Sequence, residues 1–334
     1  MPLKGHKRRS KLRSTPMVRC ALMMLAFVHG LSGQAKNPDQ EPKPLRVPAL
    51  IEEKSGDIAF DLSAANFSIE DNGLPQIVHL EADADARPVS LCLVIQTGHL
   101  ASAQADKIAR LGDLLGSLLT GPTDQVAVIT FGNRPRLALD FAASSDAALP
   151  AVNSDDSRES GAAIFDALHM AINVLDRVPA ANSRVILLIS GEHDHGSYAP
   201  NTASLTHDIL SRNLSIYGLS FSSARKEALH GLSSINPLAM GAGAMQRNVP
   251  QTVSGLTGGD FYHFDSEKNF EDDFEKIANH VHNRYSLIFV PSNPTPGLHS
   301  LRVDVQGVKA DVIAARRGYW ISGSSESDGA KGPK

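Results

Sequence analysis

The sequence predicts an α/β fold: a doubly wound, mostly parallel sheet with a small accessory β unit formed by the terminal segments. Through the middle of the chain, apolar runs of strand length alternate with amphipathic runs at helical spacing. One run, 183–190, is apolar on both faces, as in the middle of a parallel sheet. The outer segments alternate apolar and polar residues, which is typical of strands with one face in water.

The first 35 residues predict a secretory signal peptide. Seven Lys and Arg and no acidic residue precede or flank an apolar run from Cys20 to Leu31. This run is shorter than the roughly 20 residues of a spanning helix, so we favour a cleaved signal over an anchor and expect no membrane span afterwards. Arg8 and Arg9 are consecutive, so a twin-arginine export route stays open beside the general secretory one. A Pro-rich linker, 36–46, is expected next.

Charge and cysteine content narrow the possible partners. Seven of the 32 Lys and Arg lie in the signal segment, which leaves 25 basic against 36 acidic side chains, a net charge of −11 with neutral His. Nucleic acid and anionic membrane surfaces are therefore not expected as partners. Cys92 would be the remaining cysteine. Its apolar surroundings predict a buried small hydrophobe, without an intrachain disulfide.

The elements follow in order along the chain. Strand-like segments are expected at 47–86 as a β lead-in, then at 89–95, 125–132, 136–142, 183–190, 214–221, 260–264, 285–291 and 292–321. Helices are expected at 104–119, 161–178, 203–213 and 271–283. The main domain is predicted over 87–291, and a disordered tail over 322–334. We expect the β lead-in to pair with the C-terminal β segment, with Tyr319 and Trp320 as core anchors.

Six short motifs carry a resemblance to a known family. They are DLSAANFSIEDNGLPQIVHL, TGPTDQVAVITFGN, GAAIFDALHMAI, VILLISGEHDHGS, LTGGDFYHF and ARRGYW, in this order from residue 61 to 320. With this order and spacing, the chain resembles the von Willebrand factor A-type (VWFA-related) proteins of acidobacterial type. The resemblance implies a Rossmann-like VWA sheet over about residues 47–320, and a protein-interaction module.

The resemblance also implies where a metal-ion-dependent adhesion site (MIDAS) would lie. In the family, an Asp and two hydroxyls on the first loop, a Thr before the central helix and an Asp after the fourth strand hold Mg²⁺. The matching positions here are Gln96, Gly98, Leu100, Ala162 and Ser190. Without the two carboxylates, the charge that offsets dehydration of Mg²⁺ is missing. We therefore expect a degenerate site, without Mg²⁺ or another cofactor.

An alternative metal site involves a His-rich loop. The segment 191–196 offers Glu192, His193, Asp194 and His195, and His99 is expected on the same edge of the sheet. Imidazoles with carboxylates suit a transition metal such as Zn²⁺. A solvated polar loop explains the same residues, and this is the interpretation that we favour.

The function predicted from these observations is a secreted or periplasmic, non-enzymatic protein–protein interaction module. No dinucleotide fingerprint, phosphate loop or nucleophile elbow is present in the sequence. The expected partner-binding rim contains Thr97, His99, Asn133, Arg134, His193 and His195. The alternatives are a metal-dependent enzyme or sensor that uses the His-rich loop, and a scaffold without a ligand at the rim.

Overall fold

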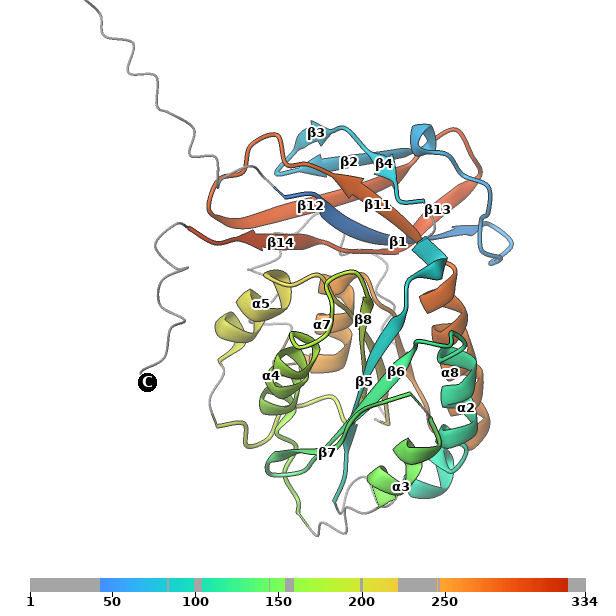
Figure 1. The fold of residues 1–334 in the computed structure, drawn as a ribbon, viewed down its shortest axis with the longest axis vertical. Helices are drawn as coiled ribbons and strands as arrows, with labels where there is room; N and C mark the ends of the chain where they lie inside the picture. Colours follow the sequence, from blue (N-terminus) through green and yellow to red (C-terminus); the bar gives the residue numbers. More distant parts are fainter. Residues whose placement is uncertain are drawn as a thin grey trace, which may run out of the picture. The chain divides into compact units, whose positions relative to one another are not determined.

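The computed structural model describes residues 43–323, except 83, 99–103, 144, 154–158, 199–200, 222–244 and 246. These residues belong to one compact unit, Pro42–Lys334 (Figure 1). The predicted signal peptide, residues 36–42 of the linker and residues 324–334 of the tail lie outside the described residues. The linker prediction extends too far, because the first strand already begins at Leu45.

The centre of the fold is a six-stranded sheet in the order β10-β9-β8-β5-β6-β7. All its pairs are parallel except β6–β7, which is antiparallel. The strands are β5 (Val89–Gln96), β6 (Gln125–Phe131), β7 (Pro135–Ala142), β8 (Ser183–Ser190), β9 (Ser215–Ser220) and β10 (Phe261–His263). Every residue of β5 is buried, since this strand lies in the middle and both its faces are covered.

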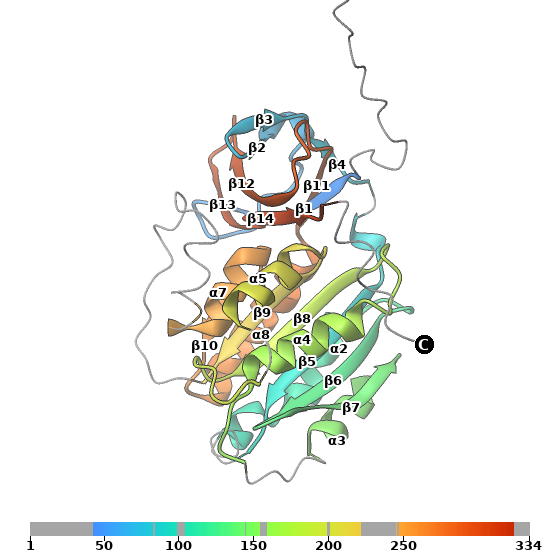
Figure 2. The ribbon, with the colours of Figure 1, turned by 90° about the vertical axis from the view of Figure 1, so that its left-hand side faces the viewer.

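Helices cover both faces of this sheet, which confirms the doubly wound α/β prediction (Figure 2). One face packs against α4 (Ile164–Leu175), α5 (Thr202–Leu210) and α7 (Val249–Thr257), and the other against α2 (Leu111–Leu118), α3 (Ala148–Asn153) and α8 (Glu267–His282). The alternation along β5 divides the core: Cys92 and Val94 face the first helix layer, and Leu91 and Leu93 face the second.

Two predicted helices are shorter in the structure. The segment 104–119 divides into a 3-10 helix, Ala105–Ile108, and α2. Gly112 and Gly116 lower the helix propensity here, and Gly112 allows close packing, since a Cβ there would meet Leu149 at 3.4 Å. The central helix α4 begins at Ile164 instead of 161, because the residues before it form a β-bridge with another loop.

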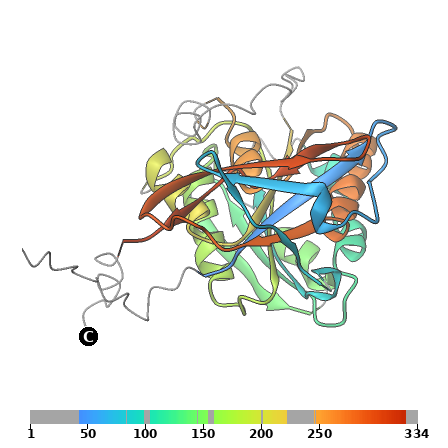
Figure 3. The same ribbon diagram turned by 90° about the horizontal axis from the view of Figure 1, so that it is seen from above.

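The terminal segments form a β unit of two four-stranded sheets, ordered β13-β1-β11-β4 and β14-β12-β2-β3. Its strands are β1 (Leu45–Glu53), β2 (Phe67–Asp71), β3 (Leu74–Gln76), β4 (His79–Leu80), β11 (Tyr285–Phe289), β12 (Gly297–Val305), β13 (Ala310–Ala315) and β14 (Gly318–Ile321). Early and late strands lie side by side (Figure 3). The predicted pairing between the two ends is thus present.

The sheet domain, Val89–His282, is an insertion between the two halves of this β unit. We placed 285–291 within the main domain, but β11 pairs with β1 and β4 instead. Its alternate residues Leu287 and Phe289 are fully buried in the core of the β unit. A period of two along one buried face fits either sheet, so the sequence alone did not separate them.

The two aromatic anchors of the β unit have different surroundings. Tyr319 is buried and stacks on His299, with ring centroids 4.7 Å apart, while its hydroxyl donates to Asp71 Oδ2 at 2.8 Å. His299 lies between two acceptors, Asp71 Oδ1 at 2.8 Å from Nδ1 and the Thr295 carbonyl at 2.7 Å from Nε2. Trp320 packs edge-on against His207 of α5, at 4.8 Å.

Arg316 joins the β unit to the sheet domain. This fully buried guanidinium donates through Nη2 to the carbonyls of Leu210 and Arg212, at the C-terminal end of α5, and through Nε to Gly318. The backbone of Arg316 also pairs with Thr257. Gly258 permits this approach: its φ is +79°, and a Cβ there would meet the Arg316 nitrogen at 2.5 Å.

Candidate binding rim at the carboxyl end of the sheet

Four loops form the rim, and three of them follow the carboxyl ends of neighbouring strands. They contain Thr97–Gly98 after β5, 132–134 after β6, 159–163 before α4, and 191–198 after β8. Because β5, β6 and β8 are parallel neighbours, these loops meet at one edge of the sheet. Two residues of the prediction, His99 and Leu100, lie outside the described residues.

Gln96 ties the end of β5 to the end of β8. Its side chain is 3% exposed, and Oε1 accepts a hydrogen bond from the backbone N–H of Gly191 at 2.9 Å. Ser190 is fully buried and donates through Oγ to the Gly191 carbonyl at 2.8 Å. Both side chains thus bind backbone groups of the same residue.

The first loop turns through a left-handed glycine. Gly98 has a φ of +92°, which fits the expected tight turn. Thr97, just before it, donates from its backbone N–H and from Oγ1 to the Phe131 carbonyl, at 2.7 and 3.2 Å. Thr97 is only 9% exposed. It contributes to the connection between β5 and β6 and offers a partner little surface.

Ala162 lies in a two-residue β-bridge with His195. The N–H of each residue donates to the carbonyl of the other, at 2.9 and 2.8 Å. Gly161 N–H donates to Asn133 Oδ1 at 2.8 Å, and Asn133 N–H donates to Glu159 Oε2 at 2.5 Å. Backbone and side-chain hydrogen bonds therefore link three of the rim loops into one structure.

The loop 191–198 also binds the N-terminus of α4. Asp194 Oδ1 accepts from the backbone N–H of Phe165 at 3.0 Å and from Ser197 Oγ at 2.5 Å. Ser197 Oγ accepts from Asp166 N–H at 3.2 Å, and Asp166 Oδ2 accepts from Tyr198 N–H at 2.7 Å. Asp166 thus binds the loop through both its backbone and its carboxylate, and the loop is held against the first turn of α4.

Both carboxylates of the His-rich loop already contact other groups of the protein. Asp194 binds the helix, and Glu192, whose side chain is 10% exposed, lies 3.4 Å from His263 Nε2. His193 and His195 are exposed, and their ring centroids are 6.2 Å apart. Among the described residues, no group of three or more His, Cys, Asp or Glu side chains is arranged to hold a metal ion.

The donors at the described MIDAS positions do not match a hard dication. Gln96, Gly98, Ala162 and Ser190 supply one amide oxygen and one hydroxyl, each already hydrogen-bonded, and no carboxylate. Mg²⁺ is bound in proteins through carboxylates and retained water. The chemistry of these side chains therefore does not fit the metal that the resemblance implies.

The exposed part of the rim differs from the predicted set. Arg134, His193 and His195 are exposed as predicted, as is Asn133, although its backbone and amide groups are committed to neighbouring loops. Tyr198 was missed and is 94% exposed. A tyrosine in a polar loop gives no periodic signal, and it becomes notable only when the loop backbone is seen to be fixed.

A family model for the von Willebrand factor type A domain matches residues 97–193. This segment runs from the end of β5, through α4 and β8, to the loop that binds the helix. It thus contains the rim residues Thr97, Asn133, Arg134 and His193, and the strands β6, β7 and β8. The chain is a VWA-type domain protein.

Solved structures that are similar to this chain include a membrane protein and two von Willebrand factor-type proteins. An aerotolerance-related membrane protein from Bacteroides fragilis is 15% identical, covering 57% of this chain and 98% of its own, with a TM-score of 0.41. A von Willebrand factor type A protein from Catenulispora acidiphila is 9% identical, covering 86% and 75%, with a TM-score of 0.45. The vWF domain of the type V pili tip protein Mfa5 from Porphyromonas gingivalis is 10% identical, covering 58% and 95%, with a TM-score of 0.42.

No curated protein matches the sequence significantly. Within the part of the VWA protein that the structure describes, no helix has the length and apolar character needed to cross a membrane.

Proposed function

We propose that this VWA protein is a non-enzymatic interaction module, of adhesion or scaffold type, that binds a protein partner through its rim without a bridging metal ion. The observation that carries the proposal is the fixed backbone of the loop 191–198, which presents His193, His195 and Tyr198 to solvent. A pre-ordered loop binds at a lower entropic cost than a mobile one.

The composition of the exposed rim supports protein recognition. Tyrosine and arginine are enriched among the residues that dominate protein–protein interfaces. Tyr198 and Arg134 are exposed, on loops that are joined through the Asn133, Gly161 and Ala162 contacts. The imidazoles of His193 and His195 and the positive charge of Arg134 would favour a polar or acidic partner surface.

In this proposal, partner binding does not require a metal ion, because the side chains at the MIDAS positions are not suited to hold one. A family member with the full site can complete the shell of its Mg²⁺ with a partner's carboxylate. Here Gln96 and Ser190 bind Gly191 instead, so recognition would rest on shape and direct hydrogen bonds. We also propose a secreted or periplasmic location, from the basic and apolar character of residues 1–35.

The test is capture of partners from native envelope extract by the purified chain, in EDTA and in millimolar Mg²⁺. We expect the same partner in both conditions. The double variant Arg134→Glu, Tyr198→Ala should lose the partner, whereas Arg302→Glu, on an exposed position of β12 in the β unit, should retain it. Capture that requires Mg²⁺, or that survives the rim variant, would refute the proposal.

A second experiment, with Zn²⁺, tests the alternative function. Thermal melts with and without Zn²⁺ compare the wild-type chain with the double variant His193→Ala, His195→Ala. A stabilisation by Zn²⁺ that this variant abolishes would support the metal-dependent enzyme or sensor. An unchanged melt would leave the His-rich loop as part of the protein-binding rim.

A further inference from the structure

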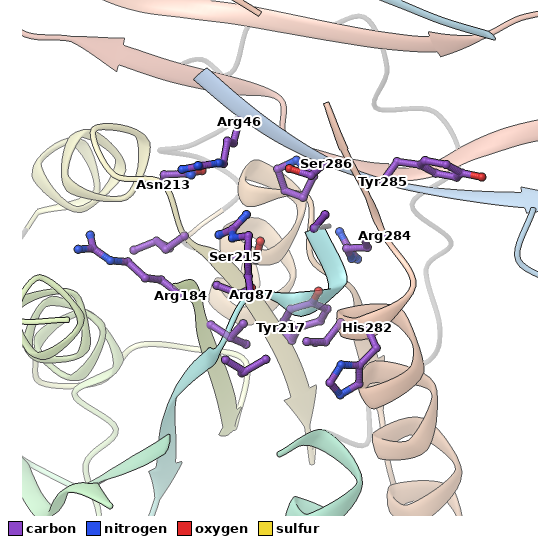
Figure 4. A pocket seen from close by; sticks show the side chains of 17 residues that line it. Arg46, Arg87, Arg184, Asn213, Ser215, Tyr217, His282, Arg284, Tyr285 and Ser286 are labelled. Atoms are coloured by element: carbon purple, nitrogen blue, oxygen red, sulfur yellow. The ribbon is translucent and has the colours of Figure 1, made fainter. Parts of the chain in front are cut away.

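A second concave site lies at the opposite edge of the central sheet from the rim. This pocket of about 80 Å³ is lined by Val89, Ser183 and Ser215, the first residues of β5, β8 and β9. Its other wall comes from β1 and β11 of the β unit. Figure 4 shows the side chains around it. The site is independent of the rim and of the function proposed for it.

The lining of this pocket is cationic. It contains four arginines and one histidine, and no Asp or Glu: Arg46, Arg87, Arg184, Arg284 and His282. This contrasts with the chain as a whole, whose formal net charge is −4. The carboxylates that bind these arginines, Glu81, Asp176 and Asp260, lie outside the lining. These carboxylates hold the guanidinium groups in place. Because they lie outside the lining, the space of the pocket is left to another group.

Some donor capacity at the pocket remains unused. Arg46 contacts Glu81 through Nε, at 2.8 Å, and its two terminal nitrogens form no hydrogen bond with any described residue. The Nε of Arg184 is buried and has no hydrogen-bond partner. A buried donor without a partner costs free energy, which a bound acceptor would recover.

The pKa of Arg87 reflects its burial and the charges of its two neighbours. Burial lowers the pKa of this guanidinium, Glu81 raises it, and the nearby charge of Arg46 lowers it again. The net pKa lies below the ordinary value for arginine. Glu81 already pairs with both arginines, and a further anion in the pocket would add to this charge compensation.

We propose that this pocket binds a phosphate-type oxyanion, either free phosphate or the phosphate group of a small molecule. The lining arginines come from four separate segments of the chain, and their combined positive charge suits a doubly charged phosphate better than a singly charged carboxylate. The adjoining cavity of about 260 Å³ has Asp61 and Glu81 in its lining. It would repel an anion, and it leaves room for the uncharged part of a monoester.

The experiment is a titration of the full chain with inorganic phosphate, followed by ³¹P NMR and calorimetry, at an ionic strength held constant with NaCl. We expect saturable binding at one site. Arg46→Gln should weaken it about tenfold or more, because it removes a charged donor while Arg87 still holds Glu81. Arg302→Gln is the matched control: this arginine is exposed and pairs with Asp304, and its variant should bind as the wild type does.

A second variant keeps the test valid if Arg46→Gln is unstable. Asn213→Asp puts a fixed negative charge into the lining and should abolish phosphate binding without removing an arginine. Glycerol 3-phosphate distinguishes the sources: tighter binding than phosphate identifies a small-molecule monoester, and equal or weaker binding identifies free phosphate. Absence of saturable binding, or equal affinity in Arg46→Gln and Arg302→Gln, would overturn the proposal.

Discussion

The carboxylate of Asp194 caps helix α4 from a loop 29 residues further along the chain, where Oδ1 accepts the Phe165 N–H at 3.0 Å. The helix has Ala163 at its N-cap, which offers no side-chain acceptor. Asp194 therefore supplies both the acceptor and the negative charge that a helix N-terminus favours. In this way one contact contributes both to the position of the rim loop and to the stability of the central helix.

Replacement of Asp194 should destabilise the fold at this contact. We expect Asp194→Ala to lower the free energy of unfolding by about 1 kcal/mol, the usual cost of a lost N-cap. Asp194→Asn should cost less, since it keeps an acceptor and loses the charge. Urea denaturation measures both, with His193→Ala as an exposed control from the same loop. Equal stability of Asp194→Ala and the control would contradict the capping role.

Arg316 should be needed to hold the β unit against the sheet domain. Arg316→Ala leaves the carbonyls of Leu210, Arg212 and Gly318 without their donor, so we expect a loss of about 2–4 kcal/mol in unfolding free energy. Arg316→Lys keeps the positive charge but loses the planar guanidinium group, and it should recover only part of the lost unfolding free energy. Differential scanning calorimetry would show the loss; a wild-type melting temperature in Arg316→Ala would argue against this role.

The stability of the chain should fall in acid through Glu81. Burial raises the pKa of this carboxyl, but hydrogen bonds from Ser286 and Arg46 and the charges of Arg87 and Arg46 outweigh burial and hold it below the model-compound value of 4.5. The unfolded state therefore takes up the proton first. The stabilisation is present above about pH 4.5 and is lost as the pH falls through the folded-state pKa.

Urea denaturation between pH 3 and 7 measures this dependence. Glu81→Gln should be less stable at pH 7 and should show a shallower decline towards pH 3 than the wild-type chain. Glu275→Gln, at an exposed position of α8, is the control and should follow the wild-type profile. Identical slopes for all three proteins would show that Glu81 does not contribute.

Cys92 should be inert in the folded protein. It is fully buried, and burial raises the pKa of its thiol far above the ordinary range, so almost no thiolate is present. In a Cys20→Ser background, we expect no reaction with a thiol reagent until guanidinium unfolds the chain. Rapid stoichiometric labelling of the native protein would contradict this.

The elements with strong local patterns were predicted well. The apolar run of β8 and the helical spacing of Ile164, Leu168 and Ile172 in α4 both reflect burial against neighbours on fixed faces. The limits of α4 were not predicted, because the bridge from Ala162 to His195 stops the helix early, and it joins residues 33 positions apart in the chain. Such a contact leaves no periodic trace in the sequence.

The two candidate sites also depend on contacts between residues that are far apart in the chain, and these contacts limit what the sequence can predict. Positions such as Gln96 and Ser190 were found because a family motif marks them, and the backbone contact expected for Gln96 is present. The arginines of the second pocket lie on four separated segments, and each alone resembles an ordinary surface residue. Only folding brings them together, so no spacing rule could have identified them.

The insertion of the VWA domain between two halves of the β unit has a mechanical consequence. Tension applied to the segments flanking Leu45 and Ile321 would pass from β1 to β13 through their antiparallel ladder, and from there along the chain to β14. That load path does not cross Val89–His282. The rim would therefore keep its geometry in a stretched molecule until β1 detaches.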